Sequence, residues 1–199
     1  MASVLKTVYT SHTGMSKNIT RKRRILPWIV AFLTLVLVII SKTAYSAGET
    51  DFRQGMTHYK NRQFDQALPC LEKAANAGNT DAQAMMGVLY FRGNGVKQND
   101  SEAARWFEKA ARAGETNAQN YLATAYMKGQ GTTPDTAKAI YWYTRAAKAG
   151  DANAQKILGA LYLNGHDGVT KDTAKARQWL RKAADQGDTD AEQLLRQIP

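Results

Sequence analysis

No residues in the sequence combine the types and the spacing that enzymatic or metal chemistry requires. The three histidines show no ligand-like spacing; they are His12, His58 and His166. Cys70 is the only cysteine, which excludes a disulfide within the chain and a cysteine-based zinc site. The only Ser-x-x-Lys sequence, Ser3-Val-Leu-Lys6, lacks the Lys-Thr-Gly triplet that accompanies it in penicillin-binding enzymes. The sequence therefore predicts no catalytic residue, no metal ligand and no cofactor.

A row of tryptophans is the other feature whose chemistry would suit contact with a ligand. Each tryptophan opens one copy of a repeated phrase, and Cys70 opens a degraded fourth copy. The copies read Trp106-Phe-Glu-Lys-Ala-Ala-Arg-Ala-Gly114, Trp142-Tyr-Thr-Arg-Ala-Ala-Lys-Ala-Gly150, Trp179-Leu-Arg-Lys-Ala-Ala-Asp-Gln-Gly187 and Cys70-Leu-Glu-Lys-Ala-Ala-Asn-Ala-Gly78. Because the Ala-Ala pair lets neighbouring helices approach, we interpret the tryptophans as packing residues and expect Cys70 to be a buried thiol.

The phrase recurs with a fixed period, which predicts a stack of helical repeats. Its closing glycines lie 36, 36 and 37 residues apart. A second helical pattern precedes each phrase, clearest at Ala82, Met86 and Tyr90, whose i, i+4, i+8 spacing forms one face of a helix. We call this first helix of each pair the A helix and the helix that carries the phrase the B helix. A glycine pair ends each A helix. The expected N-caps of the B helices are Asn99, Asp135 and Asp172.

The predicted fold is therefore all-α, an αα-superhelix of four helix pairs with a C-terminal capping helix. The predicted repeats span about residues 52–79, 80–115, 116–151 and 152–188, and the capping helix spans 189–199. Gly87 and Gly159 occupy the A-helix position where the B helix should come close, and Ala123 is the equivalent in the third repeat.

Residues 1–46 have the order of an export signal. A basic stretch ending in Arg21-Lys-Arg-Arg24 precedes the uncharged residues 25–40, and small residues follow at Ala44 and Ser46. We expect a signal peptide that is cleaved after Ser46, a polar linker over 47–51, and repeats that are periplasmic or secreted. The alternative is an uncleaved inner-membrane anchor over 25–40, which is only slightly shorter than the ~20 residues that a span needs. The repeats would lie in the periplasm in that case too.

The basic charge of the chain is concentrated before the repeats. The formal net charge is +10, but residues 47–199 carry 20 Lys and Arg against 17 Asp and Glu. The two signs are interspersed, and the sequence shows no basic stripe of the kind that binds nucleic acid. We therefore expect no nucleic-acid partner, and contact with a membrane only through residues 25–40.

The repeated residues resemble a known family. The pattern Leu/Met-Gly-x-x-Tyr-x-x-Gly-x-Gly, then Asn/Asp-x-x-x-Ala, then Trp-x-x-Lys-Ala-Ala-x-x-Gly, is similar to the Sel-one-like repeat (SLR) of the tetratricopeptide-repeat (TPR) superfamily. Three full copies over Asp81–Gly187 carry the resemblance. It implies that the A helices line a concave face that binds a protein or peptide, and that exported members act as adaptors in the bacterial envelope. Some relatives are linked to β-lactam hydrolysis, so a cell-envelope hydrolase is the alternative function, and a membrane-anchored structural spacer is a third.

Positions that differ between the A helices are the candidates for contact with a partner, because the shared positions build the stack. The preferred candidates are polar or amphipathic where the stack needs neither property; they are Asn120, Tyr121, Thr124 and Lys156. Arg92 and Lys128 could pair with acidic groups of a partner, or could simply be solvated. The sequence thus predicts a non-enzymatic interaction scaffold whose specificity lies on the A helices.

Overall fold

The computed structural model describes residues 34–36, 48–166 and 168–198. The chain divides into two compact units, Met1–Ser46 and Ala47–Pro199, and each is described by itself. In the first unit residues 34–36 are helical. The rest of the apolar stretch 25–40 and the expected cleavage site lie outside the described residues. Within the described ranges, no helix is both long and apolar enough to cross a membrane.

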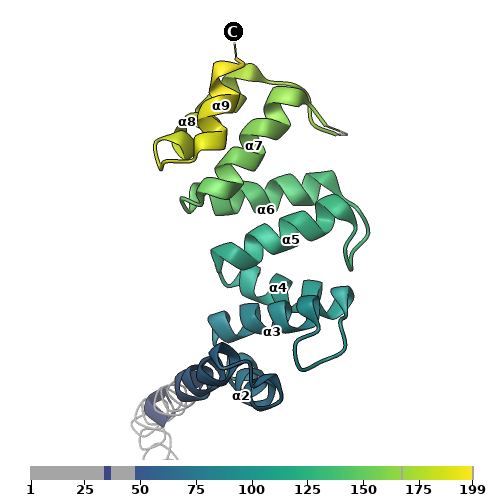
Figure 1. Cartoon of the computed structure of the whole chain (residues 1–199), viewed down its shortest axis with the longest axis vertical. Helices are drawn as coiled ribbons and strands as arrows, with labels where there is room; N and C mark the ends of the chain where they lie inside the picture. Colours follow the sequence, from purple (N-terminus) through teal and green to yellow (C-terminus); the bar gives the residue numbers. More distant parts are fainter. Residues whose placement is uncertain (1–33, 37–47, 167, 199) are drawn as a thin grey trace, which may run out of the picture. The chain divides into compact units, whose positions relative to one another are not determined.

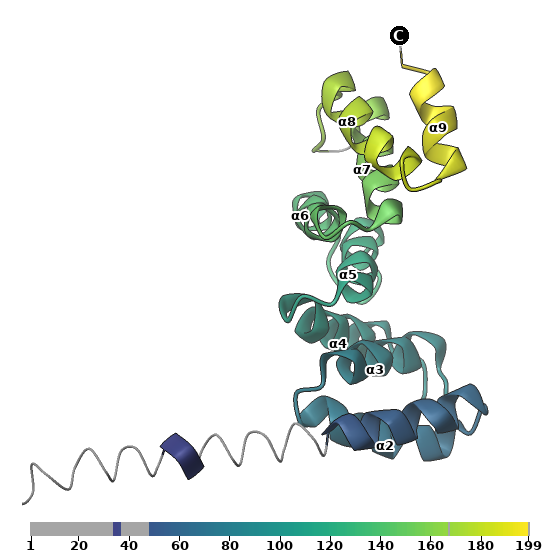
Figure 2. The same cartoon turned by 90° about the vertical axis from the view of Figure 1, so that its left-hand side faces the viewer.

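The second unit is a stack of helix pairs in chain order (Figures 1 and 2). After a helical segment over 48–60, the helices are α2 (Phe64–Asn76), α3 (Thr80–Arg92), α4 (Asp100–Arg112), α5 (Thr116–Lys128), α6 (Thr136–Lys148), α7 (Ala152–Asn164), α8 (Thr173–Ala184) and α9 (Thr189–Arg196). From α2 onward each helix packs against the next, and α9 also contacts α7. The predicted all-α αα-superhelix of helix pairs is confirmed.

The first A helix begins earlier than the sequence predicts. Residues 48–51, expected as a linker, form its first turn. Glu49 receives hydrogen bonds from the Arg53 side chain (3.2 Å) and from Nδ2 of Asn79 (3.2 Å). A Cβ added to Gly48 would lie 3.1 Å from the Cβ of Ala77. The turn is therefore tied to the end of the first repeat by contacts that a short polar sequence does not reveal.

The ends of the helices follow the residues that the sequence marks. Asn99, Asp135 and Asp172 are the N-caps of α4, α6 and α8, and each side chain accepts a hydrogen bond from a backbone N–H of the first turn. Gly93 and Gly129 end α3 and α5 in the left-handed conformation, with φ near +70°. These caps fix where each A helix stops and where the following B helix starts.

The two helices of a pair meet where a small A-helix residue faces a large B-helix residue. A Cβ at Gly87 would lie 2.6 Å from the ring of Phe107, and one at Gly159 would lie 2.5 Å from Cγ of Leu180. The close approach expected at these two glycines is thus confirmed. The B-helix residue that follows the tryptophan position is buried in all three copies. Phe107, Tyr143 and Leu180 are at most 4 % exposed.

The sequence predicts that all three tryptophans of the phrase are packing residues, but only one of them is buried. Trp142 is 7 % exposed and belongs to the central core, but Trp106 and Trp179 are half-buried. The ammonium of Lys109 lies 3.8 Å from the centre of the Trp106 ring, and that of Lys182 lies 4.7 Å from Trp179. The expectation that Cys70 is buried at this position is wrong, because the residue is half-buried, like Trp106 and Trp179.

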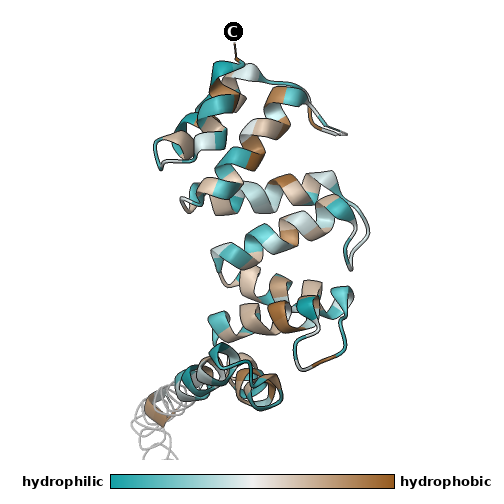
Figure 3. Cartoon of the chain, in the orientation of Figure 1, coloured by the Kyte–Doolittle hydropathy of each residue, from teal (hydrophilic) through white to brown (hydrophobic). Residues whose placement is uncertain are grey.

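Successive pairs are joined by a repeated glutamine near the start of the A helix. Nε2 of Gln119 donates to the carbonyl of Ala111 at 3.2 Å, and Nε2 of Gln155 donates to that of Ala147 at 3.0 Å. These carbonyls lie at the end of the preceding B helix, where each also accepts a turn hydrogen bond from the backbone N–H of the glycine that closes the phrase. Each helix carries hydrophobic and hydrophilic residues side by side (Figure 3). The core therefore runs between the helices along the unit, in clusters that successive repeats share.

Candidate partner-binding groove

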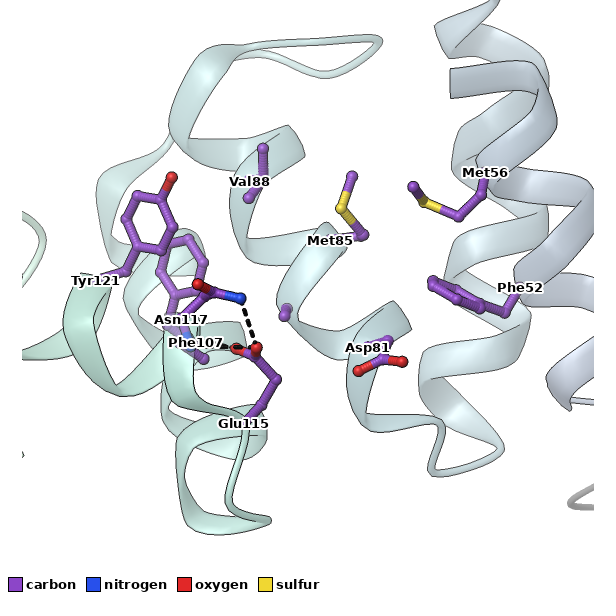
Figure 4. Close-up of a pocket in the computed structure, with 11 residues that line it drawn as sticks. Phe52, Met56, Asp81, Met85, Val88, Phe107, Glu115, Asn117 and Tyr121 are labelled. Carbon is purple, nitrogen blue, oxygen red and sulfur yellow. Dashed lines mark hydrogen bonds between the residues drawn. The ribbon is translucent and has the colours of Figure 1, made fainter. Parts of the chain in front are cut away.

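A first hollow of about 350 Å³ opens on the side of the A helices (Figure 4). Phe52 and Met56 project from the segment 48–60 toward Met85 of α3, and these side chains form an apolar wall. Asp81 and Glu115 line the end of the hollow where α3 and α5 begin. Three successive A helices thus enclose an apolar space with carboxylates at one end.

Two stacked rings form the side of this hollow that belongs to α5 and α4. The ring centres of Tyr121 and Phe107 are 4.6 Å apart and their planes differ by 7°. Tyr121 is 36 % exposed, whereas Phe107 is 3 % exposed and lies under it. Phe91 of α3 contacts the tyrosine from another side, with ring centres 6.1 Å apart. An exposed aromatic face held by a buried ring is a preorganised surface for an apolar side chain.

A second hollow of about 190 Å³ lies beside the first, toward the ends of α3 and α5. Tyr121 and Phe107 line both hollows, so the stacked pair separates them. The second hollow is also lined by Phe91, Asp100, Thr124 and Lys128. We call the two hollows together the A-face groove. It runs along α3 and α5, with the Tyr121 ring at its middle.

Three of the six residues singled out from the sequence line this groove; they are Tyr121, Thr124 and Lys128. The Thr124 hydroxyl is already engaged, since it lies 2.9 Å from the carbonyl of Asn120 and 2.8 Å from the Tyr143 hydroxyl. Burial raises the pKa of Tyr143, and this hydrogen bond offsets part of the rise. Thr124 therefore shapes the second hollow more than it offers a free hydroxyl, whereas the Lys128 side chain is exposed.

The other three candidates lie elsewhere. Nζ of Lys156 is 2.8 Å from Asp190 and 3.2 Å from Asp188, so it ties α7 to the start of α9. Asn120 lines neither hollow, and its Oδ1 is buried without a hydrogen-bond partner among the described residues. Arg92 lines a separate open hollow with Lys60 and Arg62, where the first two repeats meet.

Several groove residues were not predicted individually. Phe107 belongs to a B helix, and its position in the phrase is apolar in every copy, which is the signal of a core residue. Asp100 follows an N-cap, where an acidic residue ordinarily serves the helix dipole. Phe52 and Met56 lie in the atypical first repeat. Met85 could have been predicted as a groove residue from the sequence, because it occupies the same A-helix position as Tyr121.

The described residues show no metal-binding arrangement. Within them, no three His, Cys, Asp or Glu side chains gather closely enough to hold an ion. His58 pairs through Nδ1 with the side-chain oxygen of Gln63 at 3.0 Å, and His166 is exposed in the loop after α7. What the A face offers is an apolar surface with charged edges, which suits recognition of another chain.

Stacked antiparallel helix pairs with glycine-ended A helices define an SLR-type helical solenoid. The Sel1 repeat family matches residues 55–79, 80–115, 116–151 and 152–188. The chain therefore belongs to the Sel1 repeat family, whose repeats are TPR-like. Repeats of this family commonly serve as scaffolds for protein–protein interaction and are generally not catalytic.

Solved structures agree with this assignment. A Sel1 repeat protein from Oxalobacter formigenes is 36 % identical with a TM-score of 0.67, over 70 % of this chain and 57 % of that one. A protective antigen of uropathogenic Escherichia coli with an SLR fold is 32 % identical with a TM-score of 0.70, over 78 % of this chain and 34 % of that one. The chain thus spans about half and one third of these two relatives.

A more distant structure shares the fold alone. Cysteine rich protein B of Helicobacter pylori is 21 % identical with a TM-score of 0.51, over 59 % of this chain and 90 % of that one. Among curated proteins, none is matched by the sequence at a significant level.

Proposed function

We propose that this protein is a non-enzymatic adaptor of the bacterial cell envelope that binds a peptide or an extended protein segment in the A-face groove. The observation that carries the proposal is the Tyr121–Phe107 stack, which presents one exposed ring between two adjoining hollows. The scaffold role common among Sel1 repeats supports it. The envelope location rests on the export-like order of residues 1–46.

The dimensions of the groove fit a short extended segment. The stretch of α3 from Asp81 to Phe91 reaches from the first hollow to the second and rises about 15 Å. An extended peptide covers that distance with about five residues. One apolar side chain would enter the first hollow, against Met85, and its neighbours would pass over the Tyr121 ring. Recognition of this kind needs no chemical step, consistent with a binding function.

Selection of random dodecapeptides displayed on phage, against the immobilised full chain, tests the proposal. We expect an enriched set of peptides that bind the wild-type chain and lose most of their affinity for Tyr121→Ala. A circular dichroism melt of the variant separates lost binding from lost fold. Absence of any enriched peptide, or peptides that bind Tyr121→Ala equally well, would refute the groove as the binding site.

The location is tested separately from the binding. Expression of the full chain in a Gram-negative host, followed by fractionation and N-terminal sequencing, should yield a periplasmic or secreted form that begins at Ala47. A chain that stays in the inner-membrane fraction with residues 25–40 attached supports the anchored alternative, whereas a cytosolic chain would contradict the envelope assignment.

A further inference from the structure

The charges that line the A-face groove are unevenly balanced. Its carboxylates are Asp81, Glu115 and Asp100, and Lys128 is the single basic residue among the residues lining the two hollows. Residues 47–199 as a whole carry a small positive excess, so this acidic bias is local. A local field of this kind selects a partner of the opposite sign.

The three carboxylates are not equally available. Glu115 is the N-cap of α5 and accepts hydrogen bonds from the backbone N–H groups of Asn117 and Ala118 and from Nδ2 of Asn117. Asp81 is exposed in the first turn of α3 and has no ion-pair partner in the described part of the chain. Asp81 thus leaves a negative charge at the open end of the first hollow.

Asp100 marks the second hollow in a different way. Its Oδ1 is buried, and among the described residues it has no hydrogen-bond partner. A buried acceptor that leaves water without gaining a donor is unfavourable, and more so when it is charged. Lys128 lines the same hollow, yet no ion pair joins the two side chains. The hollow therefore holds a partly buried carboxylate, and no described side chain donates to its Oδ1.

We propose that the partner segment recognised by the A-face groove is basic and apolar, with one basic side chain that pairs with Asp100 and another, about five residues away, that pairs with Asp81. This inference rests on the proposed groove function and specifies the chemistry of its partner. The apolar side chain between the two basic residues packs on Tyr121 and Met85. The spacing follows from the rise of about 15 Å along α3 between the two hollows.

The same peptide selection, followed by titration, tests this chemistry. Peptides enriched on the full chain should carry two Lys or Arg about five residues apart around an apolar residue. For a synthetic copy of such a peptide, fluorescence anisotropy should show about tenfold weaker binding to Asp100→Asn. Lys128→Ala should bind more tightly, because it removes a competing cation from the second hollow. Asp185→Asn, which removes an exposed carboxylate at the end of α8, is the matched control and should leave the affinity unchanged.

The outcomes separate this inference from the proposed function. Enriched peptides that are acidic or uncharged, yet depend on Tyr121, would overturn the basic partner and leave the groove intact. The basic partner is also overturned if Asp100→Asn and Asp185→Asn bind a basic peptide equally well. If no peptide depends on Tyr121, both ideas fail. Melting curves of the Asp100 and Lys128 variants exclude loss of fold as the cause of any change.

Discussion

Gly87 lies so close to Phe107 that a Cβ on the glycine would meet the ring at 2.6 Å. This contact sets the distance between α3 and α4, and it also holds the ring on which Tyr121 stacks. The spacing of one helix pair and the floor of the candidate groove are therefore determined by the same buried side chain. The effect of a substitution on stability can be separated from its effect on binding only by comparing variants at Gly87, on one side of the Phe107 ring, with variants at Tyr121, on the other side.

Gly87→Ala tests the spacing of the helix pair. The added methyl group must displace a rigid, buried ring, so we expect a loss of about 1–3 kcal/mol in the free energy of unfolding, measured by urea denaturation. Ala123→Gly is the matched control at the equivalent position of the third repeat. It introduces no clash and should cost about 1 kcal/mol through helix propensity, with about 1 kcal/mol more because the buried methyl group is lost. A Gly87→Ala chain as stable as the wild type would contradict the close approach.

The tryptophans provide a second test, because equivalent residues are buried to different degrees. Trp142→Ala should destabilise the chain by about 3–5 kcal/mol, since this side chain belongs to the central core. Trp106→Ala and Trp179→Ala should cost clearly less, because each ring is half-buried beneath a lysine. Thermal melts of the three variants give the order, and equal losses would contradict it.

The ion pairs of Lys156 make the attachment of α9 dependent on pH. The bond to Asp190, aided by Asp188, raises the pKa of Lys156. Burial raises the pKa of Asp188, but the backbone N–H of Ala191 and the lysine outweigh it, so the net pKa is lowered. The Asp188 contribution is present above its ordinary pKa of 3.8 and is lost as the pH falls through the lower folded value. The Lys156 contribution is present below 10.5 and is lost as the pH rises through the higher folded value.

Lys156→Met should therefore lower the melting temperature by a few degrees at neutral pH, and the difference from the wild type should shrink as the pH falls below 3.8 and through the lowered folded pKa of Asp188. Lys138→Met is the control, since its ion pair joins it to the nearby N-cap Asp135 of the same helix and links no second helix. It should change the melting temperature less. A Lys156→Met difference that persists unchanged in acid would show that the ion pairs are not its cause.

The repeated glutamines give a prediction about how the pairs are joined. Gln155→Leu removes the side-chain donor to the Ala147 carbonyl, which keeps only its turn hydrogen bond from the backbone N–H of Gly150, so we expect a loss of about 0.5–1.5 kcal/mol. Gln83→Leu breaks the equivalent bond to Ala75 in a less buried position and should cost less. Unfolding free energies of the two variants in urea supply the comparison; a Gln83 variant that loses more would contradict it.

The period of the phrase was enough to predict the fold, because each copy specifies one helix pair and its caps. Tyr121 was also predictable, since it is a large aromatic at an A-helix position that is aliphatic in the neighbouring copies. The residues with which other side chains form ion pairs could not be predicted from the sequence. Lys156 stands at a variable position, but its carboxylates belong to α9, more than 30 residues away. Nothing in the local pattern signals a pairing over that distance.

Residues that serve two roles also escaped prediction. Phe107 carries the signature of a core residue and is one, yet its ring reaches the A face because the facing residue is Gly87. Asp100 reads as an ordinary first-turn acid, and only the assembled structure places it in a hollow without a partner. The helical turn over 48–51 depends on contacts with Asn79 and Ala77, which follow the first B helix.

The central claim is that partner binding occurs on the A-face groove, at Tyr121. Its most direct test compares Tyr121→Ala with Tyr141→Ala, which removes a 54 % exposed tyrosine from a B helix. The measurement is the dissociation constant of one selected peptide, by fluorescence anisotropy, for both variants and the wild type. We predict at least about tenfold weaker binding for Tyr121→Ala and no change for Tyr141→Ala. Equal affinity of Tyr121→Ala and the wild type, or a loss confined to Tyr141→Ala, would contradict the account.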